Sequence, residues 1–331
     1  MWVPGMRRRE ILLALGGAAW SLAARAQQRD ATRKIGVLMG AEQSVLGETY
    51  LKAFTKRLEE LGWTASRNAR LDVRWWSGGP EQMRPAVADM LAAGPDVVMV
   101  FSNLALALLK PMAPQIPIVF VGVGDPVGDG FVASLSRPGA NITGLSGTEA
   151  PMASKWLEVL KESAPHISRV MSLVQLETPA HQAMWNVIRE AASRSGIDAA
   201  AANVKNSGEI ERAVESFAVQ PNGGIIVVPH AVTWANGDLI AALTARHRIP
   251  AIYATEGSVI SGGLMSYGLD FVHSFRQTAE YVDRILRGTK PAELPVQQPT
   301  KFKLTYNLKT AKAIGLNIAP TLLTRADEVI E

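Results

Sequence analysis

The chain contains one short sequence pattern twice. Residues 114–126 are PQIPIVFVGVGDP and residues 247–258 are HRIPAIYATEGS, so Ile-Pro, a short apolar run and an acid-bearing loop recur 133 positions later. A chain of 331 residues exceeds the usual size of one domain and can hold two sizeable cores. The repeat therefore predicts two similar lobes, each of which uses this pattern to build one of its strands.

Alternating strand and helix patterns surround both copies. In the first half we expect strands at 34–39, 71–75 and 95–101 and helices at 47–61 and 81–93. In the second half we expect strands at 169–174 and 224–228 and helices at 179–195 and 207–218. This order favours parallel sheets with helices on both faces. The predicted fold class is α/β with two doubly wound, Rossmann-like lobes, in which the repeated pattern is the fourth strand of each.

The first 26 residues are typical of an export signal. Arg7 to Arg9 precede an apolar stretch at 11–24, and Ala24-Arg25-Ala26 offers small residues before a cut at Gln27. The apolar stretch is too short to span a bilayer. Arg8-Arg9 also resembles a twin-arginine signal, so both the Sec route and the twin-arginine route of export stay open.

Charge and cysteine content narrow the class of protein. Four arginines and one glutamate in the export signal account for most of the net charge of +4, so we expect no nucleic-acid binding. The chain has no cysteine, which excludes disulfides, thiol catalysts and a lipid-bearing cysteine. We therefore expect a mature protein that is free in a bacterial periplasm.

Two facing lobes of this kind would enclose a ligand where the carboxyl ends of their strands meet. The candidate ligand-binding residues at these strand ends are Ser102, Asn103, Gly124, Asp125, His230, Glu256 and Asp270. An α-amino acid carries one anion and one cation, so its site should pair amide donors with a nearby acid. We accordingly expect a small amino-acid-like or related carboxylate ligand.

Each candidate residue also has a structural alternative. Ser102 and Asn103 open a helix and suit a ligand carboxylate, but they would serve equally as a helix cap. Asp125 could hold an ammonium group or initiate a turn before Pro126. Glu256 or Asp270 could bind the ammonium group across the cleft. His230 could stack on a ligand or be an ordinary loop histidine.

Patterns for catalysis, cofactors and metals are weak. Gly144 to Thr148 resembles a nucleophile elbow but lacks the second glycine. Gly122 and Gly124 precede Asp125-Pro126, which makes a poor dinucleotide fingerprint. The remaining histidines, at 166, 181, 247 and 273, lack metal-ligand spacing. We expect a protein that is not an enzyme and has no cofactor or metal.

Several long segments resemble one known family. GDPVGDGFVASLSRPGANITGLS at 124–146, GGLMSYGLD at 262–270 and YVDRILRGTKPAELPVQQPTKFKLTYNLKTAKAIGL at 281–316 are similar to ABC-transporter substrate-binding proteins of the tryptophan/tyrosine-uptake type. The resemblance implies a type I periplasmic-binding-protein fold whose lobes are joined by three hinge segments. It also implies an inner-membrane ABC permease as partner, and we expect a monomer. A periplasmic sensor that signals to a membrane receptor is the alternative.

Glycines and prolines interrupt the regular βα order at three places. These lie near 144–148, 261–263 and 295–300, where we expect the chain to cross between lobes. The expected first lobe then comprises 33–145 and 262–295. The expected second lobe comprises 146–261 and 296–331.

Overall fold

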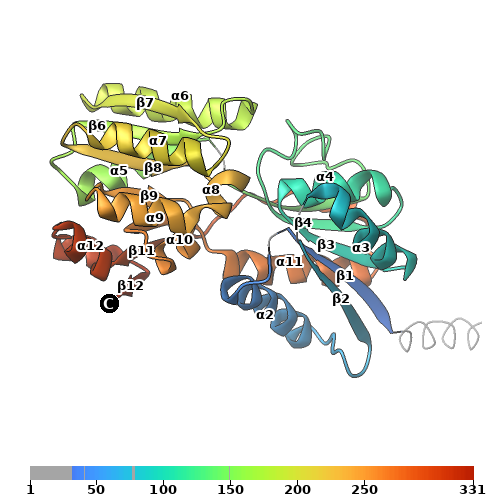
Figure 1. The fold of residues 1–331 in the computed structure, drawn as a ribbon. Coiled ribbons are helices and arrows are strands. Elements are labelled where there is room, and N and C mark those ends of the chain that lie inside the picture. Colours follow the sequence, from blue (N-terminus) through green and yellow to red (C-terminus); the bar gives the residue numbers. More distant parts are fainter. Residues whose placement is uncertain (1–31, 41, 77–78, 149) are drawn as a thin grey trace, which may run out of the picture.

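A computed structural model describes residues 32–40, 42–76, 79–148 and 150–331. Within these residues the chain forms two lobes, each a sheet flanked by helices, that lie side by side (Figure 1). The predicted export signal at 1–26 lies outside the described residues. No described helix combines the length and apolar character that a membrane span requires.

The first lobe is built on a parallel sheet. Its described strands follow the order β2-β1-β3-β4-β5. They are β1 (Arg33–Met39), β2 (Ala69–Trp75), β3 (Val97–Phe101), β4 (Ile118–Val123) and β5 (Ile142–Ser146). The helices of this lobe are α2 (Val45–Glu60), α3 (Pro80–Ala92), α4 (Asn103–Met112) and, from much later in the chain, α11 (Phe271–Leu286), followed by the 3₁₀ turn η1 (Pro291–Glu293). Helices α2 and α11 pack side by side on the sheet (Figure 1).

The second lobe repeats this arrangement and extends it. Its described strands follow the order β12-β11-β10-β9-β8-β6-β7, all parallel to their neighbours except the β10–β11 pair. They are β6 (Arg169–Val174), β7 (Asp198–Asn203), β8 (Gly223–Val227), β9 (Ala251–Tyr253), β10 (Met265–Leu269), β11 (Phe302–Asn307) and β12 (Glu328–Ile330). The helices are α5 (Met152–Ser163), α6 (Pro179–Arg194), α7 (Ser207–Ala218), α8 (Ala231–Ala235), α9 (Gly237–Arg246), α10 (Glu256–Ile260), α12 (Leu308–Ile314) and α13 (Pro320–Arg325).

The topology confirms the predicted duplication. The order β2-β1-β3-β4-β5 recurs as β7-β6-β8-β9-β10, which is the order of a doubly wound sheet with its switch point beside the first strand. The repeated pattern forms β4 and β9, the fourth strand of each copy. The β4 segment is almost wholly buried and β9 is fully buried, as parallel strands covered on both faces require.

The chain passes between the lobes at three described places. It leaves the first lobe after Ser146 of β5, returns between Leu269 and Phe271, and leaves again between Gln297 and β11. The middle crossing lies about eight residues later than the expected one. The cause is β10, which was expected in the first lobe but pairs with β9 and β11 and so belongs to the second sheet.

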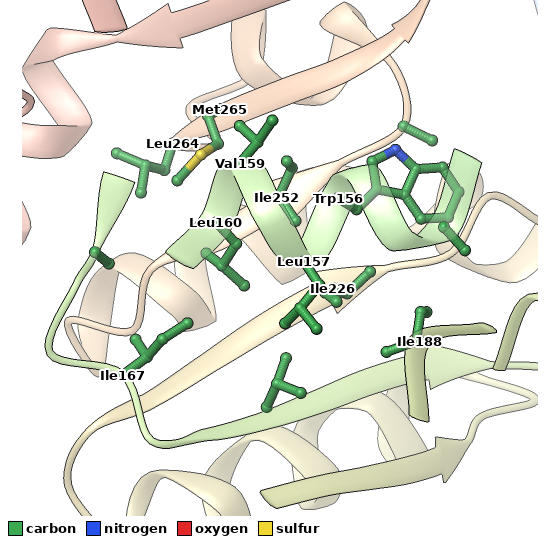
Figure 2. Close-up of a cluster of buried hydrophobic side chains, with 14 of the residues drawn as sticks. Trp156, Leu157, Val159, Leu160, Ile167, Ile188, Ile226, Ile252, Leu264 and Met265 are labelled. Atoms are coloured by element: carbon green, nitrogen blue, oxygen red, sulfur yellow. The ribbon is translucent and has the colours of Figure 1, made fainter. Parts of the chain in front are cut away.

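Helix α5 shows how the second lobe packs its core. Its apolar face supplies Trp156, Leu157 and Leu160, which lie among side chains of β8 and β9 such as Ile226 and Ile252 (Figure 2). The Trp156 indole nitrogen donates a 2.7 Å hydrogen bond to the backbone carbonyl of residue 267 on β10. These contacts fix α5 to β8, β9 and β10 of the second sheet.

Candidate functional site

A cavity of about 240 Å³ lies between the lobes, where the carboxyl ends of both sheets face each other. The first lobe lines it from the ends of β1 and β3, from the first two turns of α2 and from the start of α11. The second lobe lines it from α8, from the start of α9 and from α10 with the residues that flank it. The lining residues are Met39, Ser44, Leu46, Gly47, Tyr50, Phe101, Trp234, Gly237, Asp238, Thr255, Gly257, Ser258, Ser261 and Phe271.

Aromatic rings form the first lobe's wall of this cavity. The Tyr50 ring lies 5.3 Å from the Phe271 ring, and Phe101 meets Phe271 edge-on at 5.5 Å. Gly122 makes room for two of these rings, because a Cβ atom there would stand 2.9 Å from Phe101 and 3.1 Å from Phe271. Gly122 also has a φ of 69°, which favours glycine.

Trp234 on α8 supplies the aromatic part of the opposite wall. The centroid of its ring lies 6.4 Å from that of Phe101, and the angle between the ring planes is only 19°, so the two rings are nearly parallel across the lobes. Trp234 remains 41% exposed, so a large part of this apolar side chain is uncovered. The lobes also approach closely beside it, where a Cβ atom on Gly257 would stand 3.0 Å from Leu46.

Few polar groups line the cavity. Asp238, in the first turn of α9, is the one ionised side chain among the lining residues. The described residues provide no hydrogen-bond or ion-pair partner for its exposed carboxylate. The hydroxyl of Ser44 caps α2 by accepting from the Gly47 amide at 3.1 Å. The cavity is thus mostly apolar, with one free anion at its edge.

A charged network lies behind the Tyr50 ring. Glu256, at the start of α10, accepts hydrogen bonds from the Tyr50 hydroxyl at 3.4 Å and from the Lys303 ammonium at 2.5 Å. Lys303 also contacts Glu328 at 2.6 Å. Burial, then the charge of Glu256, raises the pKa of Tyr50 above its usual range, so this hydroxyl stays a neutral donor. Burial opposes the charge of Lys303, but hydrogen bonds to both glutamates raise its pKa.

The predicted residues of the first lobe lie together at its strand ends, beside the cavity lining. Ser102 caps α4, accepting from the Ala105 amide, and its φ of 89° marks strained backbone. The side chain of Asn103 ties α4 to Gly124 through two hydrogen bonds, of 2.7 and 2.9 Å. Asp125 is exposed and accepts from the Gly128 amide at 2.9 Å, which is the turn-forming arrangement.

The predicted residues of the second lobe have different surroundings. Glu256 is the acid already paired with Lys303. Asp270 caps α11 by accepting from the His273 amide at 2.8 Å. Neither carboxylate is among the cavity-lining groups, although Thr255, Gly257 and Phe271 beside them are. A ligand role for these residues stays a prediction.

His230 is buried at the start of α8 and faces a second histidine. Its ring lies 5.3 Å from that of His181, and both its nitrogens are buried without a hydrogen-bond partner among the described residues. Burial, then the charge of His181, lowers the pKa of His230 to about 4. His181 comes after β6 and His230 comes after β8, and these two strands lie on either side of the switch point of the second sheet. The two histidines are therefore neutral groups at the carboxyl ends of the strands, which face the other lobe.

Sequence reasoning missed the aromatic lining and Asp238. Phe101 directly precedes Ser102, and Phe271 directly follows Asp270, so the cavity-lining rings are sequence neighbours of two predicted polar residues. Phe101 and Phe271 resemble ordinary core residues in sequence, and Tyr50 has the spacing of a buried helix face.

Among the described residues, no group of three or more histidine, cysteine or acidic side chains could hold a metal ion. The lining of the inter-lobe cavity is mostly apolar and aromatic, with a few polar groups. Such an arrangement between two lobes is suited to reversible enclosure of a small organic molecule.

Two doubly wound lobes, three crossings and a cavity between them are the architecture of the type I periplasmic-binding-protein fold. Residues 34–330 match the sequence profile of the family described as ABC transporter substrate binding protein. The chain belongs to this family, whose function is to bind a substrate and not to catalyse a reaction.

One curated relative and two solved structures are similar to this chain. A tyrosine-binding protein from Clostridioides difficile (strain R20291) is 22% identical over 285 residues, covering 86% of this chain and 81% of that protein. An ABC domain from Streptococcus pneumonia, solved in complex with L-Trp, superimposes with a TM-score of 0.80 at 23% identity, covering 91% of this chain and all of that one. A conserved domain protein from Vibrio cholerae also gives 0.80, at 24% identity, covering 90% of this chain and 99% of that one.

Proposed function

We propose that this protein captures a small aromatic amino-acid-like ligand between its lobes and delivers it to an ABC permease in the inner membrane. The aromatic lining contributed by both lobes is the observation that carries the proposal. Tyr50, Phe101 and Phe271 come from one lobe and Trp234 from the other, so a ligand held by all four bridges the cleft.

The spacing of Phe101 and Trp234 favours a planar ligand group. A flat ring inserted between two parallel rings needs about 7 Å, twice the van der Waals separation of roughly 3.5 Å. The ring centroids are 6.4 Å apart and the planes lie 19° from parallel, so the two rings would have to move apart to admit such a ring. Closing on it would bury the exposed face of Trp234, which supplies a reason for that exposure.

Uptake from the periplasm fits the rest of the chain. The export signal predicted at 1–26 would deliver the protein there, and the relatives bind amino acids according to their names, tyrosine in one and L-Trp in another. A ligand that binds the closed arrangement better than the open one shifts the lobes toward closure. The permease would then distinguish the loaded protein from the empty one.

The test is a calorimetric and thermal-shift screen of aromatic and aliphatic amino acids with the mature protein. An aromatic ligand at about 100 times its dissociation constant should stabilise the protein by roughly 2.7 kcal/mol. Trp234→Ala should weaken binding of that ligand by about 1–3 kcal/mol, because it removes one of the two facing rings. Val219→Ala is the control, since Val219 is an exposed apolar residue of the same lobe away from the cavity.

Two outcomes would contradict the proposal. One is a screen in which only aliphatic amino acids, or no amino acid at all, stabilise the protein. The other is an aromatic ligand whose affinity is unchanged by Trp234→Ala, which would place the ligand outside the inter-lobe cavity.

A further inference from the structure

The charges around the inter-lobe cavity are unevenly distributed. Its fourteen lining residues include one acid, Asp238, and no lysine, arginine or histidine. A ligand carboxylate would therefore meet only neutral donors there, such as the hydroxyls of Thr255 and Ser258. A ligand ammonium group would meet a carboxylate that has no partner among the described residues.

The neighbouring charged network does not change this balance. Lys303 does not line the cavity; its ammonium group lies between the carboxylates of Glu256, at 2.5 Å, and Glu328, at 2.6 Å. Two carboxylates already balance its single charge. It is therefore poorly placed to bind a ligand anion, and the network as a whole adds negative charge behind the wall.

The aromatic walls act in the same direction. The faces of tryptophan, tyrosine and phenylalanine rings carry partial negative charge and attract organic cations, most strongly where water is excluded. Tyr50, Phe101, Trp234 and Phe271 surround the same space whose edge carries Asp238. Rings and carboxylate together form an enclosure that favours a cation.

We propose that the cavity requires a positively charged ammonium group on its ligand, bound by the Asp238 carboxylate and the aromatic walls, whereas a ligand carboxylate is dispensable. This inference rests on the proposed function, because it takes the inter-lobe cavity as the ligand site. It extends the ligand class from aromatic amino acids to aromatic primary amines and excludes aromatic acids that lack an amine.

The experiment compares three ligands that share one ring and differ in whether they carry an ammonium group, a carboxylate or both. Calorimetry with the mature protein would use L-tryptophan, tryptamine and indole-3-propionate, with L-tyrosine, tyramine and 3-(4-hydroxyphenyl)propionate as a second triplet. The amine should bind within about 10-fold of the amino acid, and the acid should bind at least about 100-fold more weakly, as expected for loss of a charge-assisted contact. An aliphatic triplet of L-leucine, 3-methylbutylamine and 4-methylpentanoate completes the panel.

Asp238→Asn tests the anchor itself, since it removes the charge and keeps the shape. It should weaken binding of the amino acid and the amine by about 10- to 100-fold, and leave the acid unchanged or improved. Asp198→Asn is the matched control, because Asp198 is an exposed acid at the far end of the same sheet. The control should leave all affinities unchanged, and melting temperatures of both variants establish that they are folded.

The outcomes separate the two proposals. An acid that binds as well as its amino acid, an amine that does not bind, or an Asp238→Asn variant with unchanged affinities would each overturn the charge requirement. If only the aliphatic triplet binds, with the amine still favoured over the acid, the aromatic ligand of the proposed function is wrong and the charge requirement stands. If no ammonium compound binds, both are overturned.

Discussion

Replacing Lys303 should destabilise the protein more than replacing its partner Glu256. The Glu256 side chain is only 13% exposed, and its carboxylate is held by Lys303 at 2.5 Å and more weakly by Tyr50 at 3.4 Å. Lys303→Met removes the cation and leaves this enclosed carboxylate without a counter-charge. Glu256→Gln instead leaves Lys303 paired with Glu328 at 2.6 Å. The two single variants therefore disrupt the pair unequally.

The size of the effect follows from the burial of the pair. Breaking a fully buried ion pair costs about 3–5 kcal/mol, and an exposed pair contributes about 0–1 kcal/mol. Side-chain exposures of 29% for Lys303 and 13% for Glu256 lie between these cases. We expect Lys303→Met to cost about 2–3 kcal/mol, Glu256→Gln about 1 kcal/mol, and the double variant less than the sum of the two.

Denaturant unfolding of the ligand-free protein measures these differences, with the two single variants and the double variant forming a cycle. Arg194→Met is a suitable control, because its 4.0 Å contact with Glu190 joins two largely exposed side chains and should contribute almost nothing. Strictly additive losses in the cycle, or a Lys303→Met loss no larger than that of the control, would refute the reasoning.

Two further predictions concern Gly122 and His230. Gly122→Ala and Gly130→Ala place alanine at the same φ of 69°, but only at Gly122 would the new Cβ meet two phenylalanine rings. Gly122→Ala should therefore lower the free energy of unfolding by about 1–3 kcal/mol more than Gly130→Ala, and it should also weaken ligand binding. The pKa of His230 is lowered to about 4 from an ordinary value of 6.5, so between these two pH values the unfolded chain binds a proton that the folded chain does not. The free energy of unfolding should therefore fall as the pH drops from 6.5 toward 4, by up to about 1.4 kcal/mol per pH unit. His230→Gln should flatten the dependence of the unfolding free energy on pH between 6.5 and 4, whereas His166→Gln, at an exposed position, should not. Equal slopes in the two variants would contradict the assignment of this pH dependence to His230.

The sequence alone determined the fold class and indicated the strand ends that lie beside the inter-lobe cavity. Apolar runs such as 169–174 and helical spacing such as 207–218 depend on local pattern, and the structure forms both at those residues. The repeated Ile-Pro pattern identified the fourth strand of each lobe, because the same local sequence forms the same element twice. Strand ends in a parallel sheet share one edge, so the site could be placed there before any contact was known.

Only the tertiary structure decided which side chains line the cavity and which charges are free. Neighbouring residues at a strand end point in different directions, so Phe101 lies in the cavity wall while the hydroxyl of the adjacent Ser102 caps a helix. Glu256 and Asp238 look alike in sequence, but Lys303, on a strand 47 residues away, neutralises one and leaves the other unpaired. Pairing across such separations depends on how the lobes pack, because contacts between distant residues leave no mark on local periodicity.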